Sequence, residues 1–570
     1  MKIKKDEKVK LMRQYGIKLL VLFLLLTSWS TVLMCQDKRD LYSDTRENIH
    51  LYGEVYKKVV GSYVEPVDPE AFMRAGIDGM MNALDPYTIY LKKEAQENIE
   101  LMTKGKYYGV GMRITVRNGW PTCAEQPFPN SPAQKASIRE GDKIIEIDGE
   151  STKNLSLTET ASRLRGEEKG SKVRIKIRRV GVEEPISITL IRDEIVISVI
   201  QYKGMVEPGI GLINVNVFNR GAGEQVKTAL EELLDQGMES LILDLRGNPG
   251  GLLDVAVNVL SNFFDDNTMV VYTKGRNQRT DQEYRTEGIP IFANKPLIVL
   301  VDQYSASASE IVSGAIQDLD RGVVIGHETF GKGLVQNVIP LDRKGRHQLK
   351  MTTAKYYLPS GRLIQRSDVF KRNGESVLLD PVQEDSIRPV YTTENGRQVY
   401  GGGGIRPDIE IDNEKLSRYV SMLRFHSLFF NFSLRYAADH NPTEKDFTVD
   451  KDMLDTFFTF VDTSDFEYSP EGMAELDSLE TIARRNGFYE QFEPQIEILR
   501  DKFQSVESKE RSESINDIKF MIKQELAAKW FGNDASYVTR FERDEVIKKA
   551  IDILKNEQEY QNQIKLNIEN

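Results

Sequence analysis

The chain has 570 residues, of which 40% are hydrophobic and 29% are charged, and its formal net charge is −11. This length suffices for about three to five domains, and the composition is that of soluble globular protein, which excludes wholesale disorder, collagen and a polytopic membrane protein. The negative charge argues against a nucleic-acid partner, and two cysteines with five scattered histidines exclude a disulfide framework and a structural cysteine-type zinc site, so we expect no metal and no cofactor.

The N-terminal segment has the charge pattern of an export signal. Residues 1–18 carry seven Lys/Arg and two acidic residues, and an apolar run follows over residues 19–34. We therefore expect residues 1–35 to be a signal peptide or a membrane anchor, and the rest of the chain to lie in the periplasm or cell envelope. The run of 16 residues is shorter than the about 20 that span a bilayer, and Cys35 follows Met34 instead of the small residue typical of a lipoprotein site. A cleaved signal, an uncleaved anchor and a lipid attachment remain alternatives.

Two further regions precede the centre of the chain. Residues 40–104 have apolar side chains at helical spacing, which predicts an N-terminal helical region. Residues 105–195 contain short apolar runs separated by glycine and proline turns, which predicts a small β-rich domain. The runs expected to be strands there are 143–147, 173–177 and 186–191.

The second half of the chain contains an α/β region and a helical region. Residues 197–412 alternate strands, such as 241–245 and 297–301, with helix-like segments, which predicts a layered α/β core. A charged, glycine-containing loop insertion occupies residues 366–404. Residues 413–570 have few glycines and helical spacing, so we expect a helical C-terminal domain, in which we identify no catalytic motif.

The β-rich region contains an ordered series of turn motifs. It opens with Gly109-Val110-Gly111-Met112, and Ser-Pro-Ala at 131–133 and Glu-Gly-Asp at 140–142 follow. In this order the motifs resemble a PDZ domain, which implies that a substrate peptide adds to it as an extra strand. The resemblance assigns peptide binding to residues 109–112: backbone N–H groups at the two glycines would meet the terminal carboxylate, and Val110 and Met112 would contact an apolar last residue.

Three more segments carry a second resemblance. They are residues 244–251 (Asp-Leu-Arg-Gly-Asn-Pro-Gly-Gly), 305–310 (Ser-Ala-Ser-Ala-Ser-Glu) and 329–336 (Thr-Phe-Gly-Lys-Gly-Leu-Val-Gln). Together with the PDZ pattern they resemble the carboxyl-terminal processing peptidases, or tail-specific serine proteases, over about residues 45–412. The resemblance implies a catalytic core of the crotonase and Clp-protease kind. It also implies a serine endopeptidase that cleaves envelope proteins with accessible C-termini, while leaving the oligomeric state open.

Peptide hydrolysis requires a nucleophile, a base and a site for the oxyanion. No histidine lies in a recognisable triad context, so a serine–lysine pair is the natural alternative. A lysine acts as a base only when neutral, which near neutral pH requires a pKa of roughly 7–8 in place of about 10.4, a change that burial can produce. Lys332 lies between two glycines, where the backbone permits close approach, and on a strand Gln336 would share its face and hold the amine.

The sequence offers three candidate nucleophiles. Its chemistry does not choose among Ser305, Ser307 and Ser309, and Ser307 with Glu310 also forms a helix-capping pattern. The family's serine lies 25 residues before its lysine, and this spacing from Lys332 selects Ser307.

The same resemblance suggests the oxyanion site and a group of supporting residues. The N–H of Ala308 would lie at a helix N-terminus and bind the oxyanion, with Gly250 or Gly251 supplying a second N–H. The supporting residues are Asp244, Arg246, Glu310 and Asp318.

Two other functions are compatible with parts of this pattern. An inactive PDZ scaffold or chaperone would share the fold, but the joint presence of Ser307, Lys332 and Gln336 argues against it. A carrier of apolar ligands, similar to the retinoid-binding repeats of the photoreceptor matrix, would share the core, but the export signal and the PDZ pattern argue against that.

Overall fold

The computed structural model describes residues 43–91, 96, 99, 101, 103–366, 388–411, 416–442 and 446–565. The predicted export signal and residues 367–387 of the predicted loop insertion lie outside these ranges. The chain divides into two compact units, one ending at Pro86 and one beginning at Tyr87. Within the described ranges, no helix has the length and apolar character needed to cross a membrane.

The N-terminal unit is helical, as its spacing predicts. It contains a helix over residues 43–62 and α2 (Pro69–Asn82). Asp68 begins α2 by accepting the backbone N–H groups of Glu70 and Ala71.

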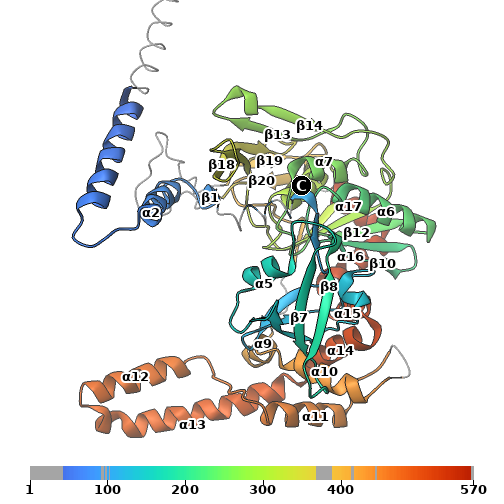
Figure 1. The fold of residues 1–570 in the computed structure, drawn as a ribbon. Helices are drawn as coiled ribbons and strands as arrows, with labels where there is room; N and C mark the ends of the chain where they lie inside the picture. The colour runs from blue at the N-terminus through green and yellow to red at the C-terminus, as the bar shows by residue number, and fades with distance from the viewer. Residues whose placement is uncertain are drawn as a thin grey trace, which may run out of the picture. The chain divides into compact units, whose positions relative to one another are not determined.

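The second unit contains the β-rich domain (Figure 1). Its antiparallel sheet has the order β3-β4-β5-β7-β8, with β6 paired to β5. The bounds of its elements are β3 (Ile114–Arg117), β4 (Trp120–Cys123), α4 (Pro132–Lys135), β5 (Lys143–Ile147), β6 (Glu150–Ser151), α5 (Leu157–Leu164), β7 (Lys172–Arg178) and β8 (Ile186–Ile191). Alternate residues of β7 (Val173, Ile175 and Ile177) are buried in an apolar cluster. A separate pair, β2 (Lys106–Gly109) with β9 (Asp193–Val196), flanks this sheet in the chain.

The α/β core is a six-stranded sheet with helices on both faces. Its order is β10-β11-β12-β15-β16-β21, and it is parallel from β11 onward. The strands are β10 (Ile200–Glu207), β11 (Ile210–Val215), β12 (Ser240–Asp244), β15 (Leu297–Val301), β16 (Val323–Gly326) and β21 (Ile409–Glu410). Because both faces are covered, β12 and β15 are buried along their whole length and read as continuous apolar runs.

Alternate side chains of the core sheet face two different helical layers. One face packs against α6 (Ala222–Asp235), α7 (Leu253–Leu260) and α8 (Ala308–Asp318). The other face packs against α16 (Glu545–Lys555) and α17 (Glu557–Lys565). The last helices of the chain therefore complete the layered core.

A second sheet lies beside the core and carries part of the site. Its order is β1-β18-β13-β14, with β17 also paired to β18. Its strands are β1 (Ile89–Leu91), β13 (Met269–Gly275), β14 (Gln282–Arg285), β17 (Leu334–Pro340) and β18 (Gln348–Tyr357). A short helix η1 (Gln278–Thr280) lies between β13 and β14. A separate hairpin of β19 (Val390–Thr392) and β20 (Gln398–Tyr400) follows later in the chain.

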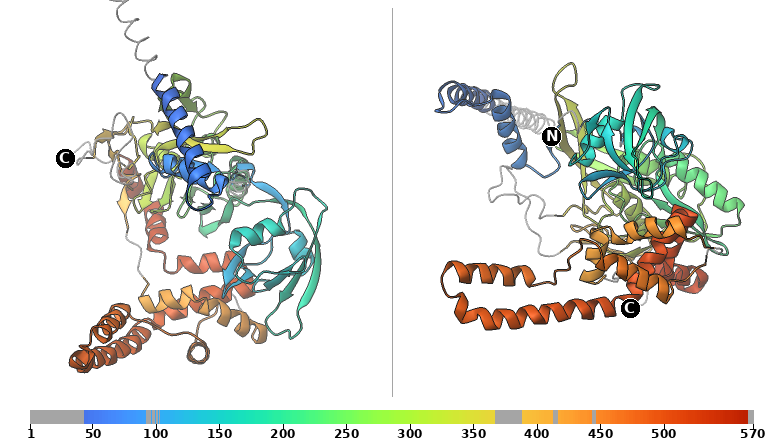
Figure 2. Two further views of the ribbon diagram at one scale, coloured as in Figure 1. Left: turned by 60° about the vertical axis from the view of Figure 1, so that its left-hand side comes forward. Right: turned by 60° about the horizontal axis from the view of Figure 1, so that its bottom comes forward.

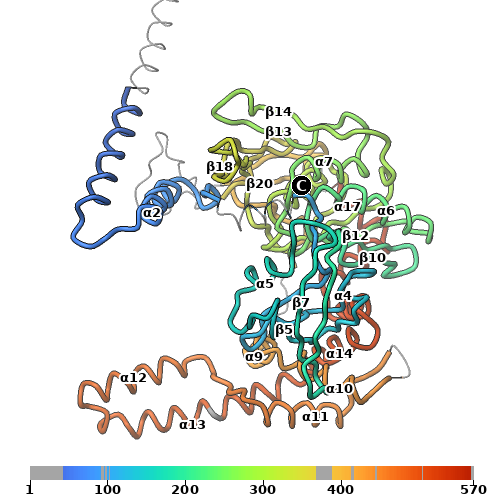
Figure 3. Tube along the Cα trace, in the orientation of Figure 1, coloured from blue at the N-terminus to red at the C-terminus, as the bar shows by residue number. Residues whose placement is uncertain are grey.

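The remaining C-terminal helices form their own aromatic-rich cluster. Four of them pack together: α9 (Arg418–Phe425), α10 (Leu428–Asp439), α11 (Lys451–Asp462) and α14 (Ile515–Phe531). Helices α12 (Met473–Arg485) and α13 (Tyr489–Glu513) form a hairpin (Figure 2 and Figure 3). Helix α15 (Asn533–Phe541) leads from α14 into α16 (Figure 1).

Candidate active site

Three segments that are far apart in the sequence meet around one cavity of about 320 Å³. Two of them follow β12 and β15, which are neighbouring parallel strands, so their carboxyl ends share one edge of the sheet. The third follows β16, the next strand of that sheet. Five predicted site residues line the cavity: Ser307, Lys332, Gln336, Gly250 and Gly251.

The three candidate serines have different surroundings. Ser305 is fully buried and its Oγ donates to the carbonyl of Leu245 at 2.8 Å. Ser309 is also fully buried, and its Oγ donates to the carbonyl of Asn248 at 2.9 Å. Ser307 instead lines the cavity, with φ +56° and ψ −112°, a backbone conformation that is strained for a residue with a side chain. Strain at a turn from strand to helix is typical of an exposed nucleophile.

Glu310 joins the backbone of Ser307 to that of Lys332. Its fully buried carboxylate accepts hydrogen bonds from the N–H of Ser307 (2.7 Å), the hydroxyl of Thr329 (2.6 Å), and the N–H groups of Gly331 (2.7 Å) and Lys332 (2.9 Å). Burial raises the pKa of Glu310 to about 7, although these four hydrogen bonds oppose the shift. The predicted supporting role of Glu310 therefore has a concrete geometry.

Tyr356, a residue that sequence analysis missed, makes a second connection between the same two residues. Its hydroxyl donates to the carbonyl of Lys332 and lies 3.2 Å from the carbonyl of Ser307. Burial raises the pKa of Tyr356 well above its ordinary value, so the hydroxyl stays a donor. The sequence did offer one signal, a tyrosine inside a strand. A buried tyrosine hydroxyl needs a hydrogen-bond partner, which would have marked Tyr356 for attention.

Lys332 and Gln336 line one cavity but do not lie on one regular strand. β17 begins at Leu334, after Lys332, and its pairing is irregular between Val335 and Gln336. The amide nitrogen of Gln336 donates to the carbonyl of Leu334 at 3.3 Å. The Nζ of Lys332 lies 4.8 Å from the centre of the Tyr87 ring. Lys332 lies outside the strand, because β17 begins only at Leu334, so a shared strand face does not bring it beside Gln336.

The predicted oxyanion donors lie beside Ser307. The Cα of Gly250 approaches the start of α8 so closely that a Cβ there would lie 2.8 Å from the Ala308 nitrogen and 2.9 Å from the Ser307 Cβ. The N–H of Gly250 already donates to Oδ1 of Asn248 at 2.8 Å. Ala308 and Gly251 therefore remain as candidate donors to an oxyanion.

The other predicted supporting residues act at a distance from the cavity. Asp244 and Arg246 form a bidentate ion pair with each other at the end of β12. Asp318 pairs with Arg362 at 2.7 Å, with both side chains fully buried, at the far end of α8 from Ser307. At 1.5 Å per residue that separation is about 16 Å, so Asp318 supports the helix and not the chemistry directly. In the described part of the chain, no group of three or more His, Cys, Asp or Glu residues is arranged to hold a metal ion.

The predicted peptide-binding residues form a tight loop in the β-rich domain. Gly109 ends β2 and pairs with Asp193 of β9, and Gly111 has φ +74°. Val110 and Met112 are only 3% and 7% exposed and belong to the apolar core of the domain. The side chains of Val110 and Met112 are therefore directed into the core of the domain, and the predicted contact of these side chains with a peptide's last residue stays a prediction.

Comparison with known proteins matches four parts of the chain. Peptidase family S41 matches residues 209–370, and a PDZ domain matches residues 125–179. The C-terminal helical domain of a probable PDZ-protease matches residues 420–554, and the N-terminal domain of the activating protease CtpB matches residues 27–95. The last match includes residues outside the described ranges.

Three relatives match over about three quarters of their own length. A carboxy-terminal-processing protease of Bartonella bacilliformis is 35% identical over 326 residues, which are 56% of this chain and 74% of the relative. A carboxyl-terminal-processing protease of Synechocystis is 37% identical over 319 residues, or 55% of this chain and 71% of the relative. A probable CtpA-like serine protease of Staphylococcus aureus is 31% identical over 395 residues, or 68% of this chain and 77% of the relative.

These matches and the fold confirm the predicted α/β core, the PDZ domain and the class of enzyme. The chain belongs to the carboxyl-terminal-processing serine proteases of peptidase family S41.

Proposed function

We propose that this protease is an exported endopeptidase that cleaves envelope proteins, recognises their C-terminal tails through its PDZ domain, and uses Ser307 and Lys332 as a catalytic dyad. The main support for the dyad is that two side chains, those of Glu310 and Tyr356, each link Ser307 to Lys332. Ser307 and Lys332 line one cavity, and Glu310 and Tyr356 each contact the backbone of both.

In this mechanism the Oγ of Ser307 attacks the scissile carbonyl while its proton passes to the neutral amine of Lys332. The oxyanion accepts hydrogen bonds from the N–H groups of Ala308 and Gly251. The peptide C–N bond then breaks, and the proton moves from Lys332 to the leaving amine. Water hydrolyses the acyl-enzyme by the reverse sequence of proton transfers, which restores Ser307.

The test combines dyad variants with substrates that differ only at the C-terminus. Ser307→Ala and Lys332→Ala should each lower kcat on the order of 10⁴-fold or more, because nucleophile and base act as a unit. Lys332→Arg should also fail, since arginine stays protonated. Ser305→Ala and Ser309→Ala serve as comparisons, and each should retain turnover that depends on Ser307, because its hydroxyl bonds a backbone carbonyl of residues 244–251 and does not attack the substrate. Normal turnover by Ser307→Ala would exclude the dyad.

Tail recognition is tested on the same enzyme with matched peptides. Changing the last three residues, placing Asp last, or amidating the terminal carboxylate should weaken capture by the wild type. Turnover should fall too where binding energy helps to assemble the active state. Equal capture and cleavage of the amidated and free-acid peptides would leave a general serine endopeptidase without tail specificity.

Export is supported by the basic N-terminus followed by the apolar run. Full-length protein should fractionate with the cell envelope, and protein lacking residues 1–35 should stay in the cytosol. Cys35→Ser should release membrane attachment only if a lipid is attached there. Recovery of the full-length protein from the cytosol would contradict export.

A further inference from the structure

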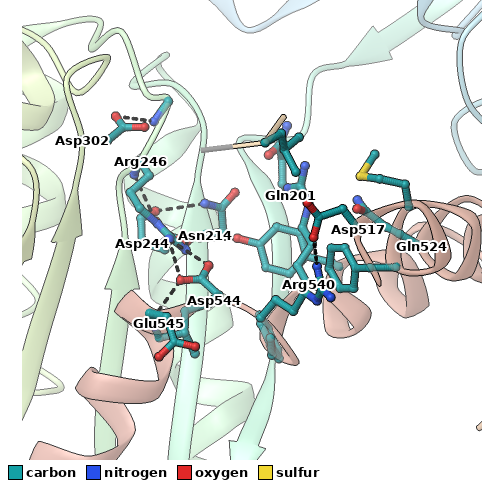
Figure 4. A pocket seen from close by; sticks show the side chains of 18 of the residues that line it. Gln201, Asn214, Asp244, Arg246, Asp302, Asp517, Gln524, Arg540, Asp544 and Glu545 are labelled. Carbon is teal, nitrogen blue, oxygen red and sulfur yellow. Dashed lines mark hydrogen bonds and ion pairs between the residues drawn. The ribbon is translucent and has the colours of Figure 1, made fainter. Parts of the chain in front are cut away.

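The C-terminal helices contact the segment that carries the predicted oxyanion glycines. We call residues 244–251 the glycine-rich segment. Arg246 in this segment donates from Nε and Nη2 to the two carboxylate oxygens of Asp244, at 2.9 and 2.8 Å. Its third nitrogen, Nη1, donates to Asp544 at the start of α16, with its shortest contact at 2.8 Å (Figure 4). The hydroxyl of Tyr537 in α15 donates to Asp244 at 3.1 Å.

These contacts form in a largely buried setting. The exposed fractions of the Asp244, Arg246 and Asp544 side chains are 2%, 18% and 17%. Hydrogen bonds between charged groups are strong under such conditions, and a buried charge that loses its partner is strongly destabilised. The Tyr537 ring stacks on Tyr202 of β10, with ring centres 4.7 Å apart. Burial and the charge of Asp244 raise the pKa of Tyr537, so its hydroxyl stays a donor.

The residues that follow Arg246 in the chain are hydrogen-bonded to the segment around Ser307. The N–H of Gly247 donates to Asp302 at 2.9 Å, just before the nucleophile segment. The carbonyl of Asn248 accepts from the N–H of Ala306 at 3.0 Å and from Ser309 Oγ at 2.9 Å. Gly250 lies so close to Ser307 that a Cβ added to it would be 2.9 Å from the Ser307 Cβ. A shift of Arg246 would therefore move the backbone that borders the oxyanion site.

We infer that Tyr537 and Asp544 are positioning residues for the protease reaction. They hold the Asp244–Arg246 pair, and through it the glycine-rich segment, in the geometry that the oxyanion site needs. The inference rests on the proposed function, since it takes Ser307 as the nucleophile and this segment as part of the oxyanion site. It also gives the C-terminal helices a role in catalysis, although they carry no residue of the cavity around Ser307.

If these contacts only attached the helices to the core, their loss would have a different effect on kinetics and stability. It would change the stability of the fold and leave the turnover of folded enzyme intact. A positioning contact instead lowers kcat with little change in KM, because the misplaced groups matter in the transition state. A misplacement of about 1 Å can lower a rate about 100-fold.

The experiment uses conservative variants of the full chain in detergent. Asp544→Asn removes the charge that faces Arg246, but asparagine still caps α16, where Asp544 accepts the N–H of Ile547. Tyr537→Phe removes the hydroxyl and keeps the ring on Tyr202. Asp517→Asn is the matched control, because Asp517 lines the cavity beside Arg246 that Tyr537 and Asp544 also line, but it pairs with Arg543 inside the helical region.

Each test variant should lower kcat for a short peptide by about tenfold, with KM changed less than about twofold. The midpoint of the pH–rate profile should not move, and Asp544→Glu should restore part of the rate. Hydrogen exchange at residues 246–251 should become faster in both test variants and stay unchanged in Asp517→Asn.

Two results would overturn the inference. The first is that both test variants have the same kcat as Asp517→Asn. This result counts only if the turnover of the wild type depends on Ser307. The other is unchanged exchange at residues 246–251, which is decisive even if the wild type cleaves no peptide. Turnover that is independent of Ser307 would instead refute the proposed dyad, so the two failures are distinguishable.

Discussion

The carboxylate of Glu310 has every acceptor position in use. An ionised carboxylate offers about four lone-pair sites, and four donors from the Ser307 and Lys332 segments occupy them. Protonation would place a hydrogen among these donors and break one of the bonds. The ionised form is therefore the one that holds the two segments together.

The titration of Glu310 should appear in the stability of the protein. Its pKa rises from about 4.5 in the unfolded chain to about 7 in the folded one. Between these values the folded protein binds a proton that the unfolded chain does not, so the contribution of this group to stability is full below pH 4.5 and declines as pH rises to about 7. The urea midpoint of the wild type should fall relative to that of Glu310→Gln over this window. A constant difference from pH 5 to pH 8 would contradict the assignment.

Glu310→Gln should also lower kcat, by about tenfold or more at pH 8, because an amide has one acceptor oxygen for four donors. Kinetics with a short peptide would measure this loss. Unchanged kcat would show that the four hydrogen bonds do not position the dyad.

At the residue scale, local motifs in the sequence were enough to identify the segments that meet at the cavity. The three segments contain the cavity-lining Ser307, Lys332, Gln336 and both glycines. Sequence alone could not separate Ser307 from Ser305 and Ser309, because the carbonyls that accept the two buried hydroxyls lie about 60 residues away in the chain. Tyr356 was missed because its partners, the carbonyls of Ser307 and Lys332, are also distant in the chain.

At the scale of elements, the glycine-rich segment connects β12 to α7 and passes beside the start of α8. Gly250 adopts φ +97°, and a Cβ there would lie 2.5 Å from the Ala306 carbonyl oxygen. Gly247 also has positive φ, +70°, but no atom lies within 4 Å of its built Cβ position. An alanine at Gly247 would therefore introduce backbone strain alone, whereas an alanine at Gly250 would also clash with the backbone beside Ser307.

Gly250→Ala should reduce kcat by about 100-fold, because the new methyl group would displace the backbone around Ser307 and Ala308. Gly247→Ala, with strain alone, should change kcat by less than about threefold and cost about 1 kcal/mol of stability. Kinetics and urea denaturation of both variants would measure the difference. Equal losses of kcat would show that the close approach at Gly250 is not needed.

Hydrophobic patterns predicted many of these elements because strand and helix periods are local properties. The runs at 143–147 and 186–191 are β5 and β8, and the buried strands at 241–245 and 297–301 are β12 and β15 within one residue. A strand does not form over the whole of 332–336, since the N–H groups of Gly331 and Gly333 donate to Glu310 and Gln365 from elsewhere in the chain.

At the scale of the whole molecule, the C-terminal helices contact the PDZ domain as well as the core (Figure 1). Lys529 of α14 forms an ion pair with Glu140, and the two side chains are 5% and 6% exposed. Nearby, the Arg117 guanidinium lies 3.4 Å from the centre of the Phe430 ring. The same helical region therefore fixes the PDZ domain and, through Tyr537 and Asp544, the glycine-rich segment.

Glu140→Gln should destabilise this arrangement by about 2 kcal/mol, because it removes the closer and more buried of the two carboxylates at the Lys529 ammonium and leaves only Glu525 at 3.6 Å. The control is Glu559→Gln, which removes the partner of Lys549 in a pair whose side chains are 39% and 35% exposed, and it should change stability by less than about 1 kcal/mol. Thermal unfolding and limited proteolysis between the PDZ domain and the core would measure both. Equal melting temperatures for the two variants would contradict the role of the buried pair.

The sequence indicated a helical C-terminal region but not its contacts. Tyr537 and Asp244 are 293 residues apart, and nothing in the spacing of either segment refers to the other. The family resemblance ended at about residue 412, so it carried no expectation for α15 or α16. Contacts of this kind follow only from the packing of α16 on the core sheet.

The most direct test of the account is the site of covalent modification by a fluorophosphonate probe, read by mass spectrometry on the full-length protease. The account predicts one adduct, on Ser307, that forms more slowly in Lys332→Ala and is absent in Ser307→Ala. Ser305→Ala and Ser309→Ala should still be modified at Ser307. An adduct on Ser305 or Ser309 in the wild type, or labelling that survives in Ser307→Ala, would contradict it.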